Sequence, residues 1–331
     1  MRAGGLIDLQ VNGFAGVDFN DAALDAPALE RALAAMRRTG VTTCLPTLIT
    51  APESVLAARL AALDAAAQAS PLGRAMVPGF HLEGPFLNPN PASAGCHPPA
   101  AMTAPDIALI DRLARPLRRP ILLLTLAPEL PGATDVIRAA RARGIVVALG
   151  HTLADAPAIA AAAAAGATLA THLGNALSAP VHKFANPLMA QLAEDALAAS
   201  FIADGIHIPP PALKVLLRAK GLARGVLVTD ATAAAAAPPG IYAFAGMTIE
   251  RGADGTVRAP GSAVLAGSSL TLDGAMRNLL AWGLADAPAA LAMARDNPAR
   301  LLAPALRAHG RALPETEMGW TADLHPIPPH G

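Results

Sequence analysis

The sequence predicts a parallel (β/α)8 barrel of the TIM type. Eight short apolar runs have the length of β-strands, and alanine-rich segments of helical length lie between most of them. Alternating strands and helices imply parallel pairing with right-handed crossovers, and eight such units suffice to close a barrel. Four of the runs also end near a polar residue: Glu83, His151, His172 and Asp230. In a barrel of this kind such residues converge on one mouth.

The elements follow in a regular order along the chain. The expected strands are LIDLQV, TTCLPTLI, VPGFHLEG, ILLLTLAP, IVVALGHT, TLATHLGN, ASFIADGIHI and GVLVTDAT. The expected helices are 27–39, 52–68, 134–143, 155–165 and 210–220, where alanine favours helix and proline suits the first turn. A doubly wound open sheet is the alternative, but no G-x-G-x-x-G follows the first strand, where a dinucleotide site would need it.

The alternation stops after the eighth run. Residues 238–263 carry Gly-Ala-Asp-Gly turn residues between short β-like runs, which predicts a hairpin-like excursion. Helical patterns resume at 269–282 and 287–302. We therefore expect one barrel domain over residues 1–304 that includes the excursion, followed by an irregular tail over residues 305–331, which is rich in Pro and His.

Composition excludes several classes of protein. The 331 residues include 25 basic and 25 acidic side chains, a balance that gives no electrostatic reason to expect nucleic acid or an anionic membrane as a partner. Hydrophobic residues reach 53%, but alanine supplies much of that fraction and no strongly apolar run is long enough for a membrane span. The first residues do not resemble a secretory signal. Cys44 and Cys96 are too few for a disulfide framework, so we expect a cytoplasmic protein.

The residues at the strand ends have the chemistry of a catalytic metal site. Zinc and similar ions bind histidine nitrogen and carboxylate oxygen, and a catalytic site leaves one position open for water. Glu83, His151 and His172 supply three ligands, which is the catalytic pattern. Asp230 remains free to accept a proton and deliver it to a leaving group. The sequence therefore predicts a metal-dependent hydrolase.

The same residues also have structural interpretations. A histidine at a strand end is often a hydrogen-bonded structural residue, and Asp230 could cap a turn or helix. The coincidence of four such residues on one rim favours the functional interpretation. His81 shares a strand face with Glu83 and is expected to be a hydrogen-bonding neighbour of the site. Cys96, beside His97, leaves a thiol nucleophile as a further alternative.

Six motifs in order carry a family resemblance. They are HLEGPFLNP, GHT, THLGNA, ADGIHI, VTDAT and AGSSLT, and the chain from Gly5 to Leu302 resembles the N-acetylglucosamine-6-phosphate deacetylases of the amidohydrolase superfamily. The resemblance implies hydrolysis of the acetamide of an N-acetylamino sugar phosphate to an amine and acetate. Two alternatives stay open: an amidohydrolase acting on another N-acyl or cyclic amide without phosphate, and an inactive sugar-binding protein.

The resemblance also assigns roles to residues. It implies one divalent metal ion, most simply zinc, held by Glu83, His151 and His172, with Asp230 as the acid–base. It implies that His97 helps to polarise the substrate carbonyl. The other substrate-contacting positions are Cys96, Asn175, Ala176, Lys183, His207, Leu265, Ala266 and Gly267.

Three departures from the family refine these expectations. Gln10 and Asn12 stand where many amidohydrolases place His-x-His, and since amides coordinate zinc poorly we expect a single metal ion. Lys183 stands where the family usually carries an Arg for the sugar phosphate. A lysine meets a phosphate as a point charge without the two-pronged contact of arginine, which leaves a substrate without phosphate as an alternative. The small β-sandwich of the family is expected to be reduced or missing, with residues 238–263 as its remnant and a homodimer covering the barrel surface.

Overall fold

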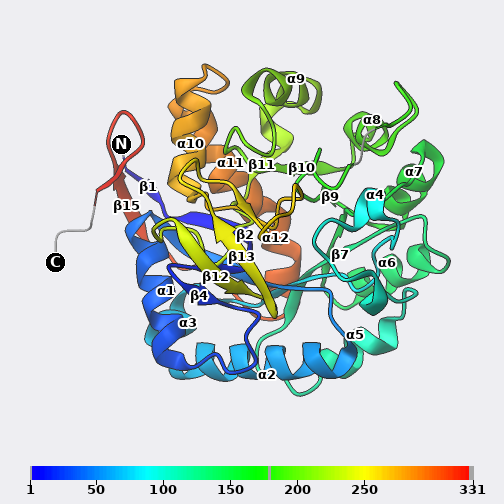
Figure 1. Ribbon diagram of the computed structural model, residues 1–331, viewed down its shortest axis with the longest axis horizontal. Helices are drawn as coiled ribbons and strands as arrows, with labels where there is room; N and C mark the ends of the chain where they lie inside the picture. Colours follow the sequence, from blue (N-terminus) through cyan, green and yellow to red (C-terminus); the bar gives the residue numbers. More distant parts are fainter. Residues whose placement is uncertain (1, 178–179, 328–331) are drawn as a thin grey trace.

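The centre of the molecule is a parallel eight-stranded barrel, seen in the computed structural model, which describes residues 2–177 and 180–327 (Figure 1). Neighbouring strands follow the order β11-β10-β9-β8-β7-β6-β5-β2, and each pair is parallel. The strands are β2 (Leu6–Val11), β5 (Val41–Ile49), β6 (Phe80–Glu83), β7 (Ile121–Leu126), β8 (Val146–Leu149), β9 (Leu169–Ala170), β10 (Ala198–Phe201) and β11 (Gly225–Leu227).

The segment after β11 completes the ring. The backbone amide of Asn12 donates to the Ala231 carbonyl at 2.7 Å, and the amide of Asp230 donates to the Gln10 carbonyl at 2.9 Å. These bonds join the end of the eighth strand to the first, so the predicted (β/α)8 barrel is confirmed.

Helices surround the barrel on the outside (Figure 1). They are α1 (Ala26–Arg38), α2 (Glu53–Ala69), α3 (Pro71–Met76), α4 (Pro91–Ala94), α5 (Ile107–Ala114), α6 (Ala133–Ala142), α7 (Ala156–Ala165), α8 (Pro187–Ala193), α9 (Pro210–Lys220), α10 (Leu272–Ala281), α11 (Ala287–Ala294) and α12 (Asp296–Ala308). Aspartates begin several of them, as where the Asp155 carboxylate accepts from the Ala158 amide at the start of α7. The five helices predicted between strands are confirmed, and the helix predicted over 287–302 is divided at Arg295 into α11 and α12.

Helix α12 closes the amino-terminal end of the barrel. It packs against β2, β7, β8 and β11, which are not all neighbours in the sheet, so the helix must cross an open end. Leu302 and Leu306 of α12 belong to the same buried apolar cluster as Leu9 and Leu123 of the strands. The carboxyl-terminal end of the barrel is thereby left as the accessible mouth.

The excursion at 238–263 forms its own three-stranded antiparallel sheet, coloured yellow in Figure 1. Its strands are β12 (Gly240–Phe244), β13 (Met247–Arg251) and β14 (Val257–Arg258). Ala245 and Gly246 join β12 to β13 with φ of 52° and 83°, the left-handed pair that a two-residue hairpin turn requires. Phe244 packs with Ile49 of the barrel, which anchors the sheet beside the mouth.

The tail differs from its prediction. Residues 305–331 were expected to be irregular, but β15 (Glu317–Trp320) pairs antiparallel with β1 (Arg2–Gly4), and β16 (Pro326–Ile327) pairs with β15. The indole of Trp320 is buried against Gly40, where an added Cβ would lie 2.3 Å from a ring carbon. The prediction missed these strands because each is only two to four residues long, so the alternation of the buried Met318 and Trp320 in β15 is too short to stand out in the sequence. This small terminal sheet is separate from the sheet of the excursion.

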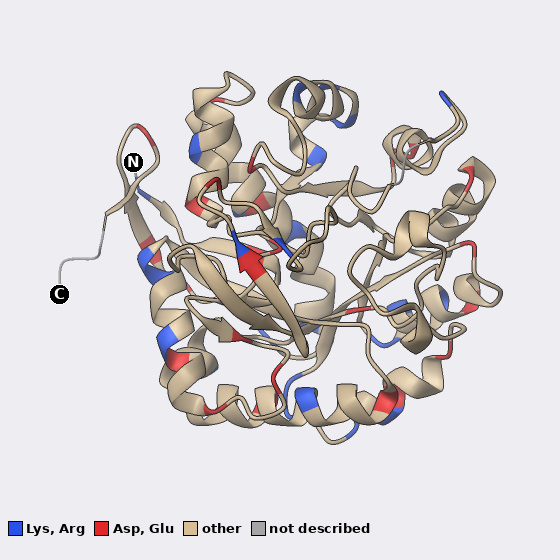
Figure 2. Ribbon diagram, in the orientation of Figure 1, with Lys and Arg blue, Asp and Glu red and all other residues tan. Residues whose placement is uncertain are grey.

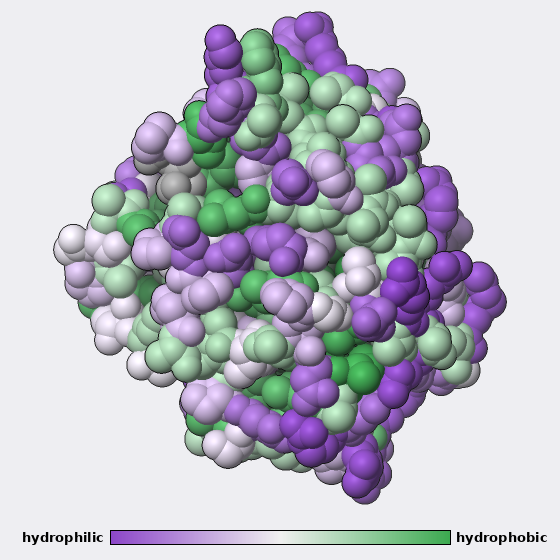
Figure 3. All heavy atoms as spheres, turned by 90° about the vertical axis from the view of Figure 1, so that its right-hand side faces the viewer, coloured by the Kyte–Doolittle hydropathy of each residue, from purple (hydrophilic) through white to green (hydrophobic). Residues whose placement is uncertain are grey.

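The outer surface is mixed in charge and hydropathy. Figure 2 shows basic and acidic residues interspersed over the outer helices. Figure 3, turned by 90°, shows hydrophilic residues beside weakly hydrophobic ones on the side that carries α6 and α7. Within residues 2–177 and 180–327, no helix has both the length and the hydropathy of a membrane span.

Candidate active site

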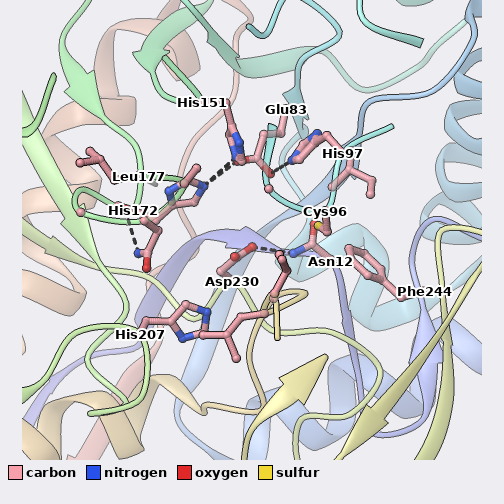
Figure 4. A pocket seen from close by; sticks show the side chains of 18 of the residues that line it. Asn12, Glu83, Cys96, His97, His151, His172, Leu177, His207, Asp230 and Phe244 are labelled. Carbon is pink, nitrogen blue, oxygen red and sulfur yellow. Dashed lines mark hydrogen bonds and ion pairs between the residues drawn. The ribbon is translucent and has the colours of Figure 1, made fainter. Parts of the chain in front are cut away.

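Four polar residues leave the carboxyl ends of barrel strands and come together at the mouth (Figure 4). Glu83 is the last residue of β6, while His151 and His172 each lie two residues beyond the end of β8 and β9. Asp230 follows β11. The apolar runs identified in the sequence thus end where a parallel barrel places its functional groups.

The backbone at three of these positions is unusual. His151, His172 and Asp230 have φ of 50°, 27° and 49°, in the left-handed region that residues other than glycine seldom adopt. Such conformations cost about 1 kcal/mol or more each and are found preferentially at functional sites. The strain occurs where the chain must turn sharply at the end of a strand.

The ligand atoms of the three predicted metal-binding residues lie very close together. Glu83 Oε1 is 2.9 Å from His172 Nε2 and 3.3 Å from His151 Nε2, and the two Nε2 atoms are 3.2 Å apart. Two ligands at about 2.0–2.1 Å from one ion in tetrahedral geometry are about 3.4 Å apart. All three side chains are at most 7% exposed. The donor set and its spacing therefore fit a divalent metal ion.

The second ring nitrogen of His151 supports this interpretation. His151 Nδ1 lies 2.9 Å from the Ser93 carbonyl oxygen, which can only accept a hydrogen bond. Nδ1 therefore carries the proton, and Nε2 presents its lone pair toward Glu83 and His172, as a metal-binding histidine does. Among the described residues, the buried His172 Nδ1 has no such partner.

His97 offers a second possible ligand set. Glu83, His97 and His151 each offer one ligand atom, and these three atoms lie within 4.8 Å of one another. His97 is therefore an alternative to His172 as the third metal ligand. The set with His172 is more compact. His97 Nε2 is 3.6 Å from Glu83 Oε2, and Thr50 Oγ1 lies 2.9 Å from His97 Nδ1. Burial, followed by the neighbouring His151, lowers the pKa of His97 to about 4, which keeps its ring neutral.

Two amides connect the carboxylates of the site. Gln10 Nε2 donates to Glu83 Oε1 at 3.0 Å and to Asp230 Oδ1 at 3.3 Å, and Asn12 Nδ2 donates to Asp230 Oδ1 at 2.7 Å. Burial and the charge of Glu83 raise the pKa of Asp230 to about 6. Burial opposes ionisation of Glu83 too, but the neighbouring rings of His151, His172 and His97 outweigh it and hold the pKa of Glu83 well below its ordinary value.

A cavity of about 350 Å³ contains this cluster. Most of the predicted site residues line it: Glu83, Cys96, His97, His151, His172, Asn175, Ala176, His207, Asp230, Leu265 and Gly267. His207 lies at the far end from His97 in Figure 4, and its Nδ1 is 2.6 Å from Asp204 Oδ2. Two predicted residues do not line the cavity. Ala266 is buried behind it, and Lys183 lies in an exposed segment with its Nζ 5.7 Å from the Phe184 ring centre.

The thiol alternative loses its chemical basis. Burial, followed by the charges of Asp230 and Glu83, raises the pKa of Cys96 to about 12. A thiol nucleophile needs the thiolate form, which such a pKa suppresses at neutral pH. His81 hydrogen-bonds with Thr47 and Thr125, at 3.2 Å and 2.8 Å, in agreement with its expected place as a neighbour of the site.

Sequence reasoning missed part of the lining. Ile49, Leu177, Phe244 and Val264 line the cavity, as do Asn12, Pro91, Ala92, Gly95 and Gly174. Phe244 belongs to the excursion, which was interpreted as the remnant of a second domain and not as a wall of the site. The one available signal was its position in YAFAG, a bulky residue directly before a tight turn.

The fold and the site together define an enzyme of the amidohydrolase class, with a parallel barrel and a His–Glu cluster beside a free carboxylate. No protein-family model matches the chain. The chain is 36% identical over 297 residues to the N-acetylgalactosamine-6-phosphate deacetylase of Escherichia coli O157:H7, covering 89% of this chain and 76% of that protein. It is 38% identical over 314 residues to the human N-acetylglucosamine-6-phosphate deacetylase, covering 91% and 74%.

Solved structures agree with these relatives. The N-acetyl-D-glucosamine-6-phosphate deacetylase of Mycobacterium smegmatis, as a mutant in complex with N-acetyl-D-glucosamine-6-phosphate, superposes with a TM-score of 0.86 at 30% identity, covering 98% of this chain and 84% of that one. The enzyme of Pasteurella multocida gives 0.85 at 27% identity, covering 98% and 83%. The chain belongs to the N-acetylglucosamine-6-phosphate deacetylase family.

Proposed function

We propose that this enzyme hydrolyses the acetamide of N-acetylglucosamine 6-phosphate to the amino sugar phosphate and acetate. The single observation that carries this proposal is the compact set of Glu83, His151 and His172, with ligand atoms 2.9–3.3 Å apart, beside Asp230. The names of the relatives support the substrate. Since a further relative is named for N-acetylgalactosamine 6-phosphate, the 4-epimer is the second candidate substrate.

One zinc ion per chain is proposed, held by Glu83, His151 and His172. A divalent metal ion in such a site acts as a Lewis acid and makes water nucleophilic at neutral pH. A single ion is favoured because the amide nitrogens of Gln10 and Asn12 donate to carboxylates. Their side chains are thus committed to positioning Glu83 and Asp230, and amides are poor zinc ligands.

Asp230 is proposed as the proton carrier. Its carboxylate accepts the proton of the attacking water and passes it to the departing amine nitrogen. A pKa of about 6 suits both steps, because the carboxylate is ionised at neutral pH and its acid form still gives up a proton readily.

His97 is proposed to donate from Nε2 to the substrate carbonyl oxygen. Its ring is neutral, and Thr50 lies 2.9 Å from Nδ1, on the opposite edge from Nε2. A neutral donor stabilises charge that develops on oxygen without first repelling a neighbouring cation.

The sugar is proposed to occupy the end of the cavity formed by Asn175, Ala176, His207, Leu265 and Gly267. His207 is the proposed phosphate contact, because Asp204 engages Nδ1 and leaves Nε2 available. Ala266 is buried next to Leu265 and Gly267 and supports this wall, and Cys96 lines the cavity on the side away from His207. Lys183 is proposed to attract the phosphate as an exposed point charge from outside the cavity.

We further propose a cytoplasmic homodimer in which residues 1–304 form the catalytic domain. Val181, Phe184 and Met189, on one segment, are 44%, 69% and 45% exposed, and a second subunit would cover them. Cys44 and Cys96 are both unpaired, as a reducing compartment allows. Light scattering after size exclusion tests the dimer, and a monomer at micromolar concentration would contradict it.

An acetate-release screen tests the function. N-acetylglucosamine, N-acetylgalactosamine and their 6-phosphates would be compared at defined zinc content. We expect the highest kcat/KM on N-acetylglucosamine 6-phosphate. Equal rates with and without phosphate would remove the phosphate from the proposal, and zinc-loaded enzyme that releases no acetate would leave a sugar-binding protein.

A further inference from the structure

The cavity has one apolar end, which the proposed reaction leaves unexplained. Ile49, Cys96 and Phe244 line the cavity at this end. Ile49 and Phe244 belong to one buried apolar cluster, and Cys96 packs against it. Ile49 is 2% exposed and Phe244 is 1% exposed. Figure 4 shows Phe244 and Cys96 on the side of the cavity away from His207 and Leu177. The polar groups proposed for the sugar thus lie opposite this wall.

The wall is attached to the reacting groups. Ile49 is the strand partner of Glu83 across β5 and β6, and it precedes Thr50, which lies 2.9 Å from His97 Nδ1. Cys96 directly precedes His97. Cys96 also lines the same cavity as Glu83 and Asp230. A carbonyl bound at His97 with its nitrogen toward Asp230 therefore has its remaining substituent near this wall.

Phe244 is fixed in place by the hairpin turn that follows it. The Ala245 amide donates to Asp18 Oδ2 at 2.6 Å, and Arg59 Nη2 donates to the Ala245 carbonyl at 2.9 Å. The backbone N–H and C=O of Ala245, on either side of its Cα, are therefore both held, the first by the Asp18 side chain and the second by the Arg59 side chain. These bonds fix the backbone next to Phe244, and the ring itself is buried in an apolar cluster, so close packing holds the wall where the acyl group must fit.

We propose that Ile49, Cys96 and Phe244 form an acyl subsite for the methyl group of the acetamide, and that Phe244 sets the upper limit on acyl-chain length. This inference rests on the proposed deacetylation. Ligands of this subsite are short unbranched acyl groups, with acetyl preferred over propionyl and butyryl. Discrimination of one methylene by a rigid apolar pocket is typically about 10–200-fold in kcat/KM.

The test compares acyl chains on one sugar. Wild type and Phe244→Ala would be assayed by amine release from N-acetyl-, N-propionyl- and N-butyryl-glucosamine 6-phosphate. For wild type we expect kcat/KM to fall about 10-fold or more per added carbon. For Phe244→Ala we expect the acetyl-to-propionyl ratio to shrink at least about 10-fold, because the removed ring leaves room for the longer chain.

Controls separate the acyl subsite from general damage. Val215→Ala removes an exposed apolar side chain of α9, outside the cavity, and should leave the acyl ratio unchanged. Phe244→Leu and Ile49→Ala provide milder enlargements of the wall if Phe244→Ala does not fold, and bound zinc and the melting temperature identify intact protein. A folded wall variant that lowers all three rates equally, with the ratio unchanged, overturns the inference and leaves the deacetylase proposal standing. Wild type that cleaves none of the three substrates overturns both.

Discussion

The two ends of the cavity are built in different ways. At the reaction end, Glu83, His151 and His172 leave buried strands and are 2–7% exposed, with ligand atoms in mutual contact. At the proposed phosphate end, the basic side chain proposed to attract the phosphate is Lys183. It lies in the exposed segment 181–186, outside the cavity. The difference indicates that the barrel fixes the chemistry, whereas loops set the choice of substrate.

The largest expected effect tests the reaction end. Asp230→Asn keeps the shape of the side chain and can still accept from Asn12, but it cannot carry a proton. We expect kcat to fall about 10²–10⁴-fold, as is typical for loss of a general acid–base, while bound zinc stays near one per chain. Acetate release and elemental analysis measure the two quantities. A variant within about threefold of the wild-type rate would remove Asp230 from the mechanism.

The next test chooses between the two overlapping ligand sets. His172→Asn should weaken zinc binding at least about 10-fold, because it removes an atom 2.9 Å from Glu83 Oε1. His97→Asn should keep the zinc and lose rate instead. Zinc titration with a competing chelator distinguishes them. The reverse pattern would show that Glu83, His97 and His151 hold the metal.

A third test concerns the buried layer beneath the reaction end. Burial raises the pKa of Asp8 to about 7 in the fold, although hydrogen bonds from Thr229 oppose the shift. The folded chain therefore holds a proton that the unfolded chain has already released above its ordinary pKa of 3.8. This carboxyl stabilises the fold most at low pH, and the contribution is lost as pH rises toward about 7, at up to about 1.4 kcal/mol per pH unit.

Asp8→Asn should remove that pH dependence. The amide oxygen can accept from the Gln10 and Thr229 backbone amides, as Asp8 Oδ1 does. The Thr229 hydroxyl donates to Asp8 Oδ2 and also lies within reach of the Gln10 carbonyl oxygen, so in the variant it can donate to that carbonyl and accept from the side-chain amide nitrogen that replaces Oδ2. The melting temperature of the variant relative to wild type should therefore rise between pH 5 and pH 8. A difference that does not change over this range would mean that Asp8 is ionised throughout.

The smallest effect is expected at the opposite end of the cavity. Lys183→Ala should raise KM for N-acetylglucosamine 6-phosphate no more than about fivefold, since exposed charges contribute about 0–1 kcal/mol. KM for the unphosphorylated sugar should not change. Increasing salt should reduce the difference. A loss of 100-fold or more would show that Lys183 grips the phosphate directly and that the loop closes in the complex.

The sequence predicted the reaction end better than the substrate end for a physical reason. Glu83, His151 and His172 follow apolar runs, and parallel strands bring their ends to one place whatever the loops do. The left-handed backbone at His151 and His172 left no sequence signal, since neither position is a glycine. Phe244 and Lys183 lie on connections whose path depends on tertiary packing. The hairpin turn at Ala245 is one such case, because Asp18 and Arg59 hold it from far away in the sequence.

The backbone at His151, His172 and Asp230 implies a conflict between activity and stability. Glycine would adopt these torsions without steric penalty, so some inactivating substitutions would relax the local chain. Under selection for stable folding alone, substitutions would accumulate at these three positions. Keeping the two histidines and the aspartate therefore requires continued selection for turnover. If variants of this enzyme are selected for stability without an activity screen, we therefore expect substitutions at these three positions among them.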